Sequence, residues 1–295
     1  MGGHLKYIKL AYSLNFEEEP IWENPPSFVF RSVLGQSLRN LTCILRQQKN
    51  CSECMVRNNC VYSIFFETNI NKDSSILEGR NKGAHPFVLE VKCIDKYNIV
   101  IEIVFIGKAI NYIPYINIAL ENAGKKGVGR NRAFYKILNI KAGYDLFDIN
   151  SIDNEIQQWP TENVIEKSIA AIVLETPCRI KKQGHLISEI TLNDLLGSIY
   201  LRMQVLYGLF SENSFSPVID HWASVDCEIV NQRWVEQSYY SSRQQSLMKL
   251  GGVVGEIKIQ EKLSSQVIQY IEAMELFHVG KNISFGLGKI KVVYE

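Results

Sequence analysis

The stretch that decides the fold is the C-terminal run His278-Val-Gly-Lys-Asn-Ile-Ser-Phe-Gly-Leu-Gly-Lys-Ile-Lys-Val-Val-Tyr294. It joins a predicted helix to a final predicted strand. Its glycines, Gly280, Gly286 and Gly288, permit positive φ and close approach to a ligand, and the lysines beside them suit a phosphate backbone. Five residues separate Gly280 from Gly286 and no Lys-Ser or Lys-Thr pair follows, so the run is neither a Walker A loop nor a dinucleotide fingerprint.

A shorter form of this loop occurs earlier in the chain, at Gly127-Val-Gly129-Arg130. It also follows a predicted helix and precedes a predicted strand. A second repeated sequence feature is Leu34-Gly35 in the first half and Leu196-Gly197 in the second. These two dipeptides are separated by roughly 160 residues, as the two loops are. The matching separations indicate that the two halves of the chain arose by duplication.

Hydrophobic periodicity predicts the same order of elements, β-α-β-β-α-β, in each half. In the first half the elements are a strand at 5–16, a helix from a Ser27 cap through Leu45, strands at 87–94 and 99–106, a helix at 110–123 and a strand at 133–140. In the second half they are a strand at 169–175, a helix at 192–210, strands at 225–235 and 253–260, a helix at 265–277 and a strand at 289–294. We therefore predict an α+β protein of two tandem ferredoxin-like, or RRM-like, domains at residues 1–150 and 151–295, with a linker or edge extension at 141–166.

The composition is that of a globular protein. Of the 295 residues, 46% are hydrophobic and 21% are charged, no apolar run approaches the length of a membrane span, and the N-terminus lacks a signal-peptide pattern. We therefore expect a cytoplasmic protein with no membrane partner. The net charge is only +1, so a nucleic acid would have to be held by local basic patches.

Four of the seven cysteines lie close together, at Cys43, Cys51, Cys54 and Cys60. Four thiolates are the number that a tetrahedral zinc ion or an iron–sulfur cluster needs, and Cys51-x-x-Cys54 has metal-ligand spacing. Against this, Cys43 is expected inside the first helix, and buried cysteines also serve as small hydrophobic side chains. The sequence leaves both interpretations open.

Basic residues gather at both glycine loops and on the first helix. Around the first loop they are Lys125, Lys126, Arg130, Arg132 and Lys136, and around the second they are Lys281, Lys289 and Lys291. Arg31, Arg39 and Arg46 recur along one face of the predicted first helix. Tight helix-to-strand turns explain the glycines equally well, but such turns do not need so many cations, so we predict phosphate contact.

The five histidines do not identify a catalytic group by themselves. His278 ends the last predicted helix beside Gly280 and Lys281, where an imidazole suits proton transfer or, alternatively, closes the helix. His85 is expected to be solvated in a polar loop. Arg243 follows a group of aromatic residues that could stack on bases or simply anchor a loop.

Several segments together resemble one known family, the CRISPR-associated repeat-processing endoribonucleases of the RAMP superfamily. The resemblance spans nearly the whole chain. The segments that carry it are Arg31-Ser-Val-Leu-Gly-Gln-Ser-Leu-Arg39, Cys51-x-x-Cys54-x5-Cys60-Val-Tyr62, Gly127-Val-Gly-Arg130, Thr176-Pro-Cys-Arg-Ile-Lys181, Tyr240-Ser-Ser-Arg-Gln244, Gly251-Gly-Val-Val-Gly255 and His278-Val-Gly-Lys-x4-Gly-Leu-Gly288.

The resemblance implies an enzyme that binds CRISPR repeat RNA and cuts it without metal, so that a metal at the cysteines would be structural. The 2′-hydroxyl before the scissile phosphate would be the nucleophile, leaving a 2′,3′-cyclic phosphate and a 5′-hydroxyl. We assign His278 as base or acid, Lys281 as electrostatic stabiliser, and Arg31 or Arg39 of the first helix as phosphate ligands. The predicted RNA-binding residues are Arg31, Arg39, Lys126, Arg130, Arg132, Arg243, Gly280, Gly286, Gly288 and Lys289.

Two other functions remain compatible with the sequence. One is a non-catalytic subunit that holds processed guide RNA beside other subunits of an effector complex. The other is a redox or metal centre at the cysteines of an unrelated enzyme. The sequence gives no preference between a monomer and a homodimer.

Overall fold

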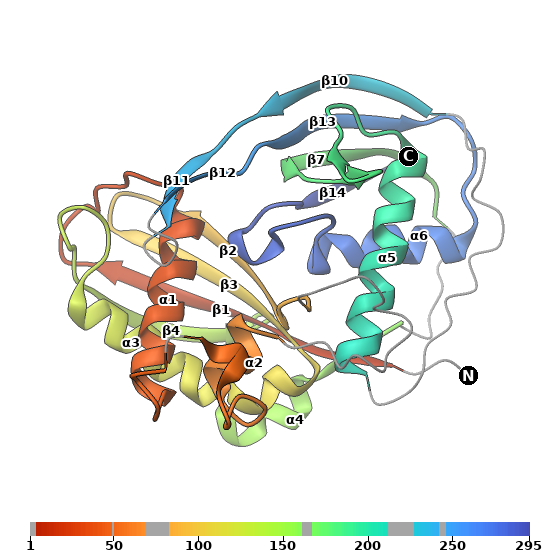
Figure 1. Cartoon of the computed structure of the whole chain (residues 1–295). Coiled ribbons are helices and arrows are strands. Elements are labelled where there is room, and N and C mark those ends of the chain that lie inside the picture. The colour runs from red at the N-terminus through yellow and green to blue at the C-terminus, as the bar shows by residue number, and fades with distance from the viewer. Residues whose placement is uncertain (1–3, 49, 69–82, 161–166, 212–226, 242–245) are drawn as a thin grey trace. The chain divides into compact units, whose positions relative to one another are not determined.

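The computed structural model describes residues 4–48, 50–68, 83–160, 167–211, 227–241 and 246–295 (Figure 1). The chain divides into two compact units. Unit 1 runs from Gly3 to Gln158 and includes Val205–Ser214, and unit 2 comprises Trp159–Gln204 and Phe215–Glu295. No helix in the described ranges is long and apolar enough to cross a membrane.

Unit 1 is built on an antiparallel sheet with the strand order β2-β3-β1-β4-β5. Its central strand alternates between buried and less buried residues, as expected for a strand with one face on the core. Its strands are β1 (Leu5–Phe16), β2 (Phe87–Cys93), β3 (Asn98–Ile106), β4 (Tyr135–Ala142), β5 (Asp145–Leu146) and β6 (Gln157–Trp159), which pairs with β1.

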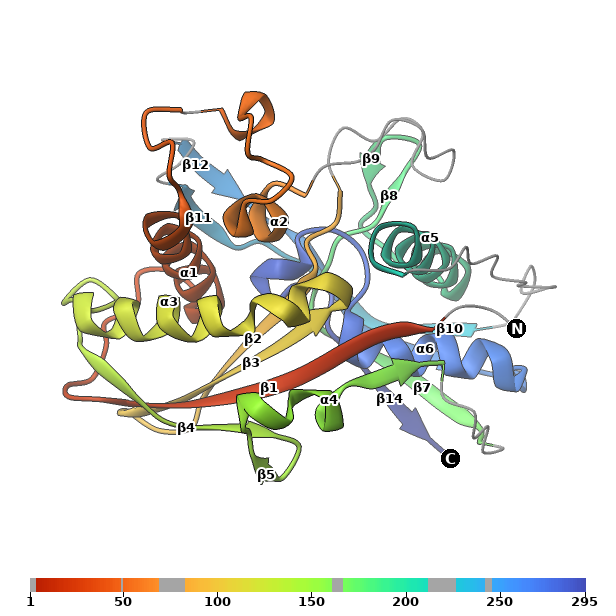
Figure 2. The same cartoon turned by 90° about the horizontal axis from the view of Figure 1, so that it is seen from below.

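Two long helices, α1 (Pro26–Thr42) and α3 (Ile113–Lys126), cover one face of this sheet (Figure 2). Phe30, Leu34 and Leu38 of α1 are buried in the core with the inward residues of the strands. The short elements of the unit are η1 (Cys51–Glu53), α2 (Val61–Phe66), η3 (Gly107–Tyr112), η4 (Ile149–Ser151) and α4 (Ile152–Glu155). The order β1-α1-β2-β3-α3-β4 is that of a ferredoxin-like fold with α2 inserted after α1.

Unit 2 repeats this topology, with the sheet order β10-β13-β7-β14. This order corresponds strand for strand to β2-β3-β1-β4 of unit 1. Its main elements are β7 (Ile169–Cys178), α5 (Leu192–Phe210), β10 (Cys227–Val235), β13 (Gly252–Ile259), α6 (Ser265–Phe277), η5 (Ile283–Phe285) and β14 (Ile290–Tyr294). The predicted α+β class with two tandem ferredoxin-like folds is confirmed.

The structure differs from the sequence prediction at several ends and connections. Helix α1 begins at Pro26, with proline in its first turn in place of the expected Ser27 cap, because a proline ring presets φ for that position. It ends at Thr42, so Cys43 lies outside the helix, in extended conformation. Two small hairpins were not predicted, and they are formed by β8 (Lys181–Lys182) with β9 (His185–Leu186) and by β11 (Ser238–Ser241) with β12 (Ser246–Lys249).

Candidate functional site

The C-terminal glycine-rich loop folds back on itself after α6. The amide of Val279 donates to the carbonyl of Gly288 over 2.9 Å, which closes the loop at its base. The loop also binds the end of β7, because Gly288 N–H donates to Pro177 O at 3.2 Å and Lys281 N–H to Arg179 O at 3.0 Å. The segment Thr176–Lys181 is therefore the support of this loop.

The glycines of this loop are required by its internal packing. Gly288 has φ +72°, and a Cβ there would lie 1.8 Å from the carbonyl oxygen of Val279. Gly280 has φ +89°, and a Cβ there would lie 2.7 Å from Arg179 O. Gly286 is left-handed with φ 80° and ends η5. The tight-turn interpretation is thus sufficient to explain the glycines, and ligand contact has to be argued from the side chains.

The cations of the same loop differ in their surroundings. Lys281 and Lys291 are exposed. Lys289 is half-buried and forms an ion pair with Glu175 at 3.2 Å, which partly neutralises it. Beneath the loop, burial lowers the pKa of the Arg179 guanidinium, which donates to Gly251 O, and burial raises the pKa of the Cys178 thiol to about 12. Lys281 and Lys291 are consequently the exposed cations of this loop.

His278, the predicted catalytic group, has no exposed surface. Its Nδ1 lies 3.0 Å from the carbonyl oxygen of Leu287, and because a carbonyl only accepts, Nδ1 carries the proton and donates. The residue is the C-cap of α6, with φ 53° and ψ 165°. In this structure the backbone N–H of His278 caps the helix by donating to Met274 O, and the imidazole holds the loop and does not reach solvent.

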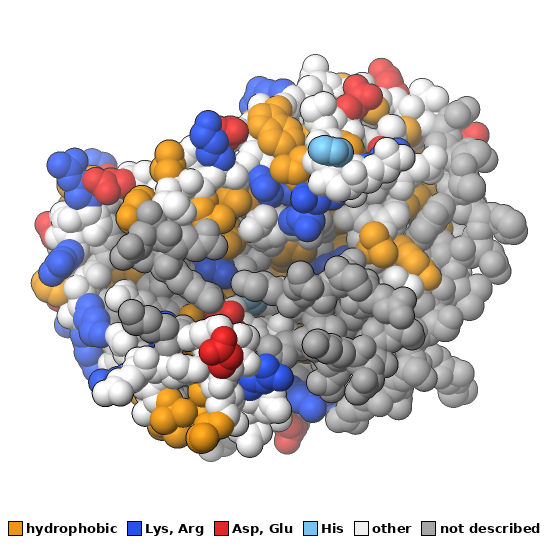
Figure 3. Space-filling model, viewed as in Figure 1, with side chains coloured by type: hydrophobic (Ala, Val, Ile, Leu, Met, Phe, Trp, Pro, Cys, Tyr) orange, Lys and Arg blue, Asp and Glu red, His pale blue; other side chains and the backbone are white. Residues whose placement is uncertain are grey.

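The first glycine loop carries a more exposed set of charges. Lys125 and Lys126 end α3, and together with Arg130, Arg132 and Lys136 they are all exposed. The guanidinium of Arg130 forms a long, exposed ion pair of 3.5 Å with Glu23. In Figure 3, Lys and Arg side chains gather along the left edge, where Figure 1 shows the end of α3 and the loop to β4. Phe134, 48% exposed, lies in the same loop and offers an aromatic ring to a base.

The arginines of α1 are held by the rings of α2. The guanidinium carbon of Arg31 lies 5.3 Å from the centroid of the Phe66 ring, and that of Arg39 lies 5.6 Å from the Tyr62 ring. Arg39 also donates to Gln48 O at 3.2 Å. Both side chains are half-buried, so α1 and α2 together fix two positive charges on one face of unit 1.

His85, expected to be solvated, is instead packed beside this pair. Its ring lies 5.9 Å from that of Phe87 and 6.1 Å from that of Phe66, and its Nε2 is 3.3 Å from Nη2 of Arg31. Because a guanidinium only donates, Nε2 accepts this hydrogen bond. The expectation of a solvated His85 was wrong because His85 lies two residues before strand β2, whose first residues are buried. This position next to a buried strand is the sequence feature that could have indicated the packing.

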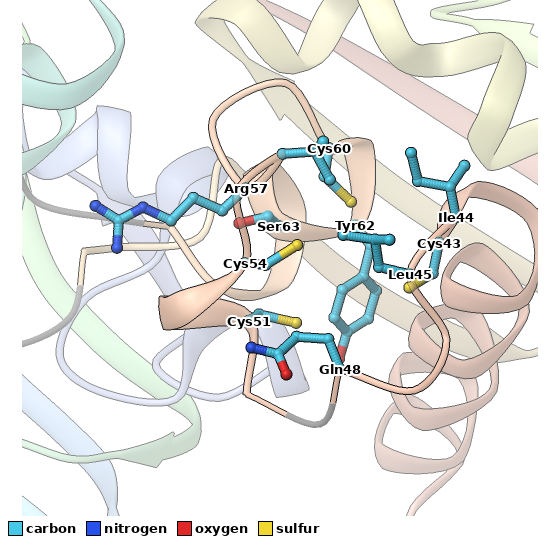
Figure 4. Close-up of a pocket in the computed structure, with 11 residues that line it drawn as sticks. Cys43, Ile44, Leu45, Gln48, Cys51, Cys54, Arg57, Cys60, Tyr62 and Ser63 are labelled. Carbon is cyan, nitrogen blue, oxygen red and sulfur yellow. The ribbon is translucent and has the colours of Figure 1, made fainter.

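All four clustered cysteines line one small cavity in unit 1 (Figure 4). They are thiols, not disulfides, and their exposure is intermediate. Among the residues that the structure describes, no three or more His, Cys, Asp or Glu side chains form a ready-made metal site. Arg243 falls outside the described residues.

Comparisons with known proteins account for both units. A family model named AF_1859_N, described as an N-terminal domain, matches residues 5–163. The model described as CRISPR-associated endoribonuclease Cas6 matches residues 172–290. Residues 172–290 of this chain belong to the Cas6 family. A comparison with curated protein sequences gives no significant match.

Solved Cas6 structures share the fold over nearly the whole length of this chain. A Cas6 product complex matches with a TM-score of 0.55 and 14% identity, over 97% of this chain and 99% of that one. Thermus thermophilus Cas6 matches with a TM-score of 0.52 and 11% identity, over 99% and 100% of the two chains. A partial Cas6-RT-Cas1–Cas2 complex matches with a TM-score of 0.52 and 13% identity, over 99% of this chain and 47% of the other.

Proposed function

We propose that this endoribonuclease cuts CRISPR precursor RNA within its repeats to release guide RNAs. The observation that carries the proposal is the Cas6 domain at residues 172–290, which spans most of the second ferredoxin-like sheet and the whole glycine-rich loop. Among the similar Cas6 structures are a product complex and a substrate-mimic complex. The exposed cations of unit 1 supply the local basic surface that a nearly neutral protein needs to bind RNA.

The proposed reaction is an in-line transesterification that the protein's own groups support without metal. The 2′-hydroxyl oxygen bonds to the adjacent phosphorus while the bond from phosphorus to the 5′-oxygen breaks. A base takes the 2′-proton, an acid protonates the leaving 5′-oxygen, and cations stabilise the charge of the phosphorane. The products are a 2′,3′-cyclic phosphate and a 5′-hydroxyl.

Within unit 1, His85 and Arg31 form the arrangement best suited to this chemistry. The imidazole is held between aromatic rings, and its Nε2 presents a lone pair to the guanidinium. If Arg31 turns to a phosphate oxygen, it releases that lone pair, which can then accept the 2′-proton. We therefore propose His85 as the proton-transfer group, with Arg31 and Arg39 as phosphate ligands. For Lys281, which lies in unit 2, we propose contact with the RNA backbone. Burial argues against the alternative assignment of His278.

Single-turnover cleavage of labelled CRISPR repeat RNA by the full chain in EDTA tests the proposal. We expect one discrete cut whose 5′ fragment ends in a cyclic phosphate, and no cut when the nucleotide before the scissile phosphate is 2′-deoxy. RNA binding without any cut would instead favour a non-catalytic subunit of an effector complex.

Histidine variants assign the proton transfer. His85→Ala should slow cleavage by about 10²-fold or more while RNA affinity changes little. His185→Ala is the matched control, because His185 lies exposed on β9, and it should cleave at the wild-type rate. An unchanged rate for His85→Ala would remove the assignment of His85 without touching the proposed reaction.

A further inference from the structure

The four clustered cysteines all stand at ends of secondary-structure elements in the connection between α1 and α2. Cys43 is the C-cap of α1, and its N–H donates to Arg39 O. Cys51 begins η1, and Cys54 ends it. Cys60 is the N-cap of α2. A group bound by all four would therefore tie the end of one helix to the start of the next.

The sulfur atoms of these cysteines face a common space. They line a cavity of about 20 Å³, together with Leu45, Gln48 and Tyr62 among others, and Figure 4 shows the four sulfur atoms directed toward its interior. Such a volume holds one water-sized body. It is suited to a single metal ion, and a cluster of several iron and sulfide ions would not fit without opening the connection.

Hydrogen bonds between side chains and the backbone hold the shape of the connection. Arg39 donates to Gln48 O at 3.2 Å, Arg57 donates to Ser52 O at 2.5 Å, and Asn50 Oδ1 accepts from Ser52 N–H at 3.2 Å. All four thiols line one cavity, but in the described part of the chain they do not yet form a ready-made metal site, so a bound ion would have to draw them together.

We propose that Cys43, Cys51, Cys54 and Cys60 bind one structural zinc ion as four thiolates. Zinc is favoured by the Cys-x-x-Cys spacing, by the count of four sulfur ligands and by the one-ion size of the cavity. A closed four-thiolate shell leaves no open coordination position, so the ion takes no part in RNA cleavage.

The zinc also positions the cations of α1, a step that rests on the proposed function. Cys60 caps α2, and Tyr62 and Phe66 of α2 contact the guanidinium groups of Arg39 and Arg31. Loss of the metal frees the start of α2 and so displaces these rings. RNA affinity should fall by about tenfold in the metal-free protein, a size typical of losing an outer-shell support.

Metal analysis of the full chain, purified from zinc-containing medium, tests the site without any RNA. We expect about one zinc per chain in the wild type and in the control variant Cys93→Ser, since Cys93 is an exposed thiol on β2. The double variant Cys51→Ser/Cys54→Ser should retain less than about a tenth of that zinc. Reconstitution of the wild type with Co²⁺ should give the visible absorption bands of tetrahedral thiolate coordination. The double variant should lack these bands.

Three results would overturn the zinc assignment. The first is a zinc content near zero in the wild type together with no cobalt spectrum. The second is an equal zinc content in the double variant and the wild type. The third is bound iron with absorbance at about 400 nm, which would indicate an iron–sulfur cluster. The metal measurements do not depend on RNA cleavage. A zinc-loaded protein that does not cut RNA would therefore contradict the proposed function and still support the zinc site. Unchanged RNA affinity in the double variant would overturn only the positioning of the arginines.

Discussion

Replacing His278 by alanine and by glycine separates its structural role from a catalytic one. Alanine removes the hydrogen bond to Leu287 O and leaves that buried carbonyl without its side-chain donor, at a cost of about 1–3 kcal/mol. It also leaves the space of a fully buried ring. The backbone at φ 53° and ψ 165° lies in a region that is essentially reserved for glycine and costs of order 1–3 kcal/mol in any other residue.

We therefore expect His278→Ala to lower the stability of unit 2 by about 2–4 kcal/mol. His278→Gly should recover about 1–3 kcal/mol of this loss, because glycine relieves the backbone strain that alanine retains. In a domain of this size the alanine variant should melt about 5–12 °C lower. A residue whose main role is catalytic would show no such order between the alanine and glycine variants.

The assay is thermal and urea unfolding of the full chain, followed by single-turnover cleavage at a temperature where each variant is folded. Both variants should cleave within about threefold of the wild-type rate, well short of the 10²-fold loss typical of a missing acid or base. The exposed His185→Ala variant should change stability by less than about 0.5 kcal/mol. Equal stability of all three variants and the wild type, or a cleavage loss of 10²-fold in folded His278→Gly, would refute the structural role.

Two further measurements test the electrostatics of unit 1. Lys126→Gln and Arg130→Gln should each weaken RNA binding and lower the slope of log K against log salt by roughly 0.7–0.9, and an unchanged slope would exclude phosphate contact at that residue. Burial raises the pKa of the Glu102 carboxyl, but hydrogen bonds from Lys92 and Lys9 outweigh this effect, and the pKa is lowered overall. The ionised Glu102 carboxylate therefore stabilises the fold at pH values above its pKa in the unfolded chain. This stabilisation is lost as the pH falls through its lower pKa in the folded protein. Glu102→Gln should therefore cost about 1 kcal/mol at pH 6 and progressively less toward pH 3, and a constant difference would contradict the pairing.

The duplicated fold was predictable because strong periodicity records burial directly. In β1 the residues that alternate in sequence are those that alternate in exposure, and in α1 the residues at helical spacing are buried. The end of α1 was less predictable. Leu45 continues the apolar spacing, yet the chain leaves the helix after Thr42, and Leu45 lines the cysteine cavity instead. Spacing alone does not distinguish packing on a helix from packing against a neighbouring loop.

The candidate site was less predictable because proximity across the fold has no local signal. His85 and Arg31 are 54 positions apart in sequence, and α2 and the start of β2 bring them to 3.3 Å. His278 is buried where its sequence neighbours indicated exposure. Its neighbours in sequence are glycines and a lysine, which indicated an open, charged loop, but the backbone of that loop closes on Gly288 and buries the ring.

The two glycine loops therefore do not have equivalent roles, although the sequence pairs them. In the second loop, Gly288 and Gly280 fit against carbonyl groups that leave no room for a side chain, and Lys289 is paired with Glu175. In the first loop, glycine serves the same purpose at Gly127, where a Cβ would lie 2.1 Å from Arg132 O, but the cations around it all remain exposed. Both loops keep the turn because backbone packing requires it, whereas the exposed charges around the two turns differ. Phosphate contact is consequently expected to be stronger at the loop of unit 1, and the salt dependence of the unit 1 variants measures that contribution directly.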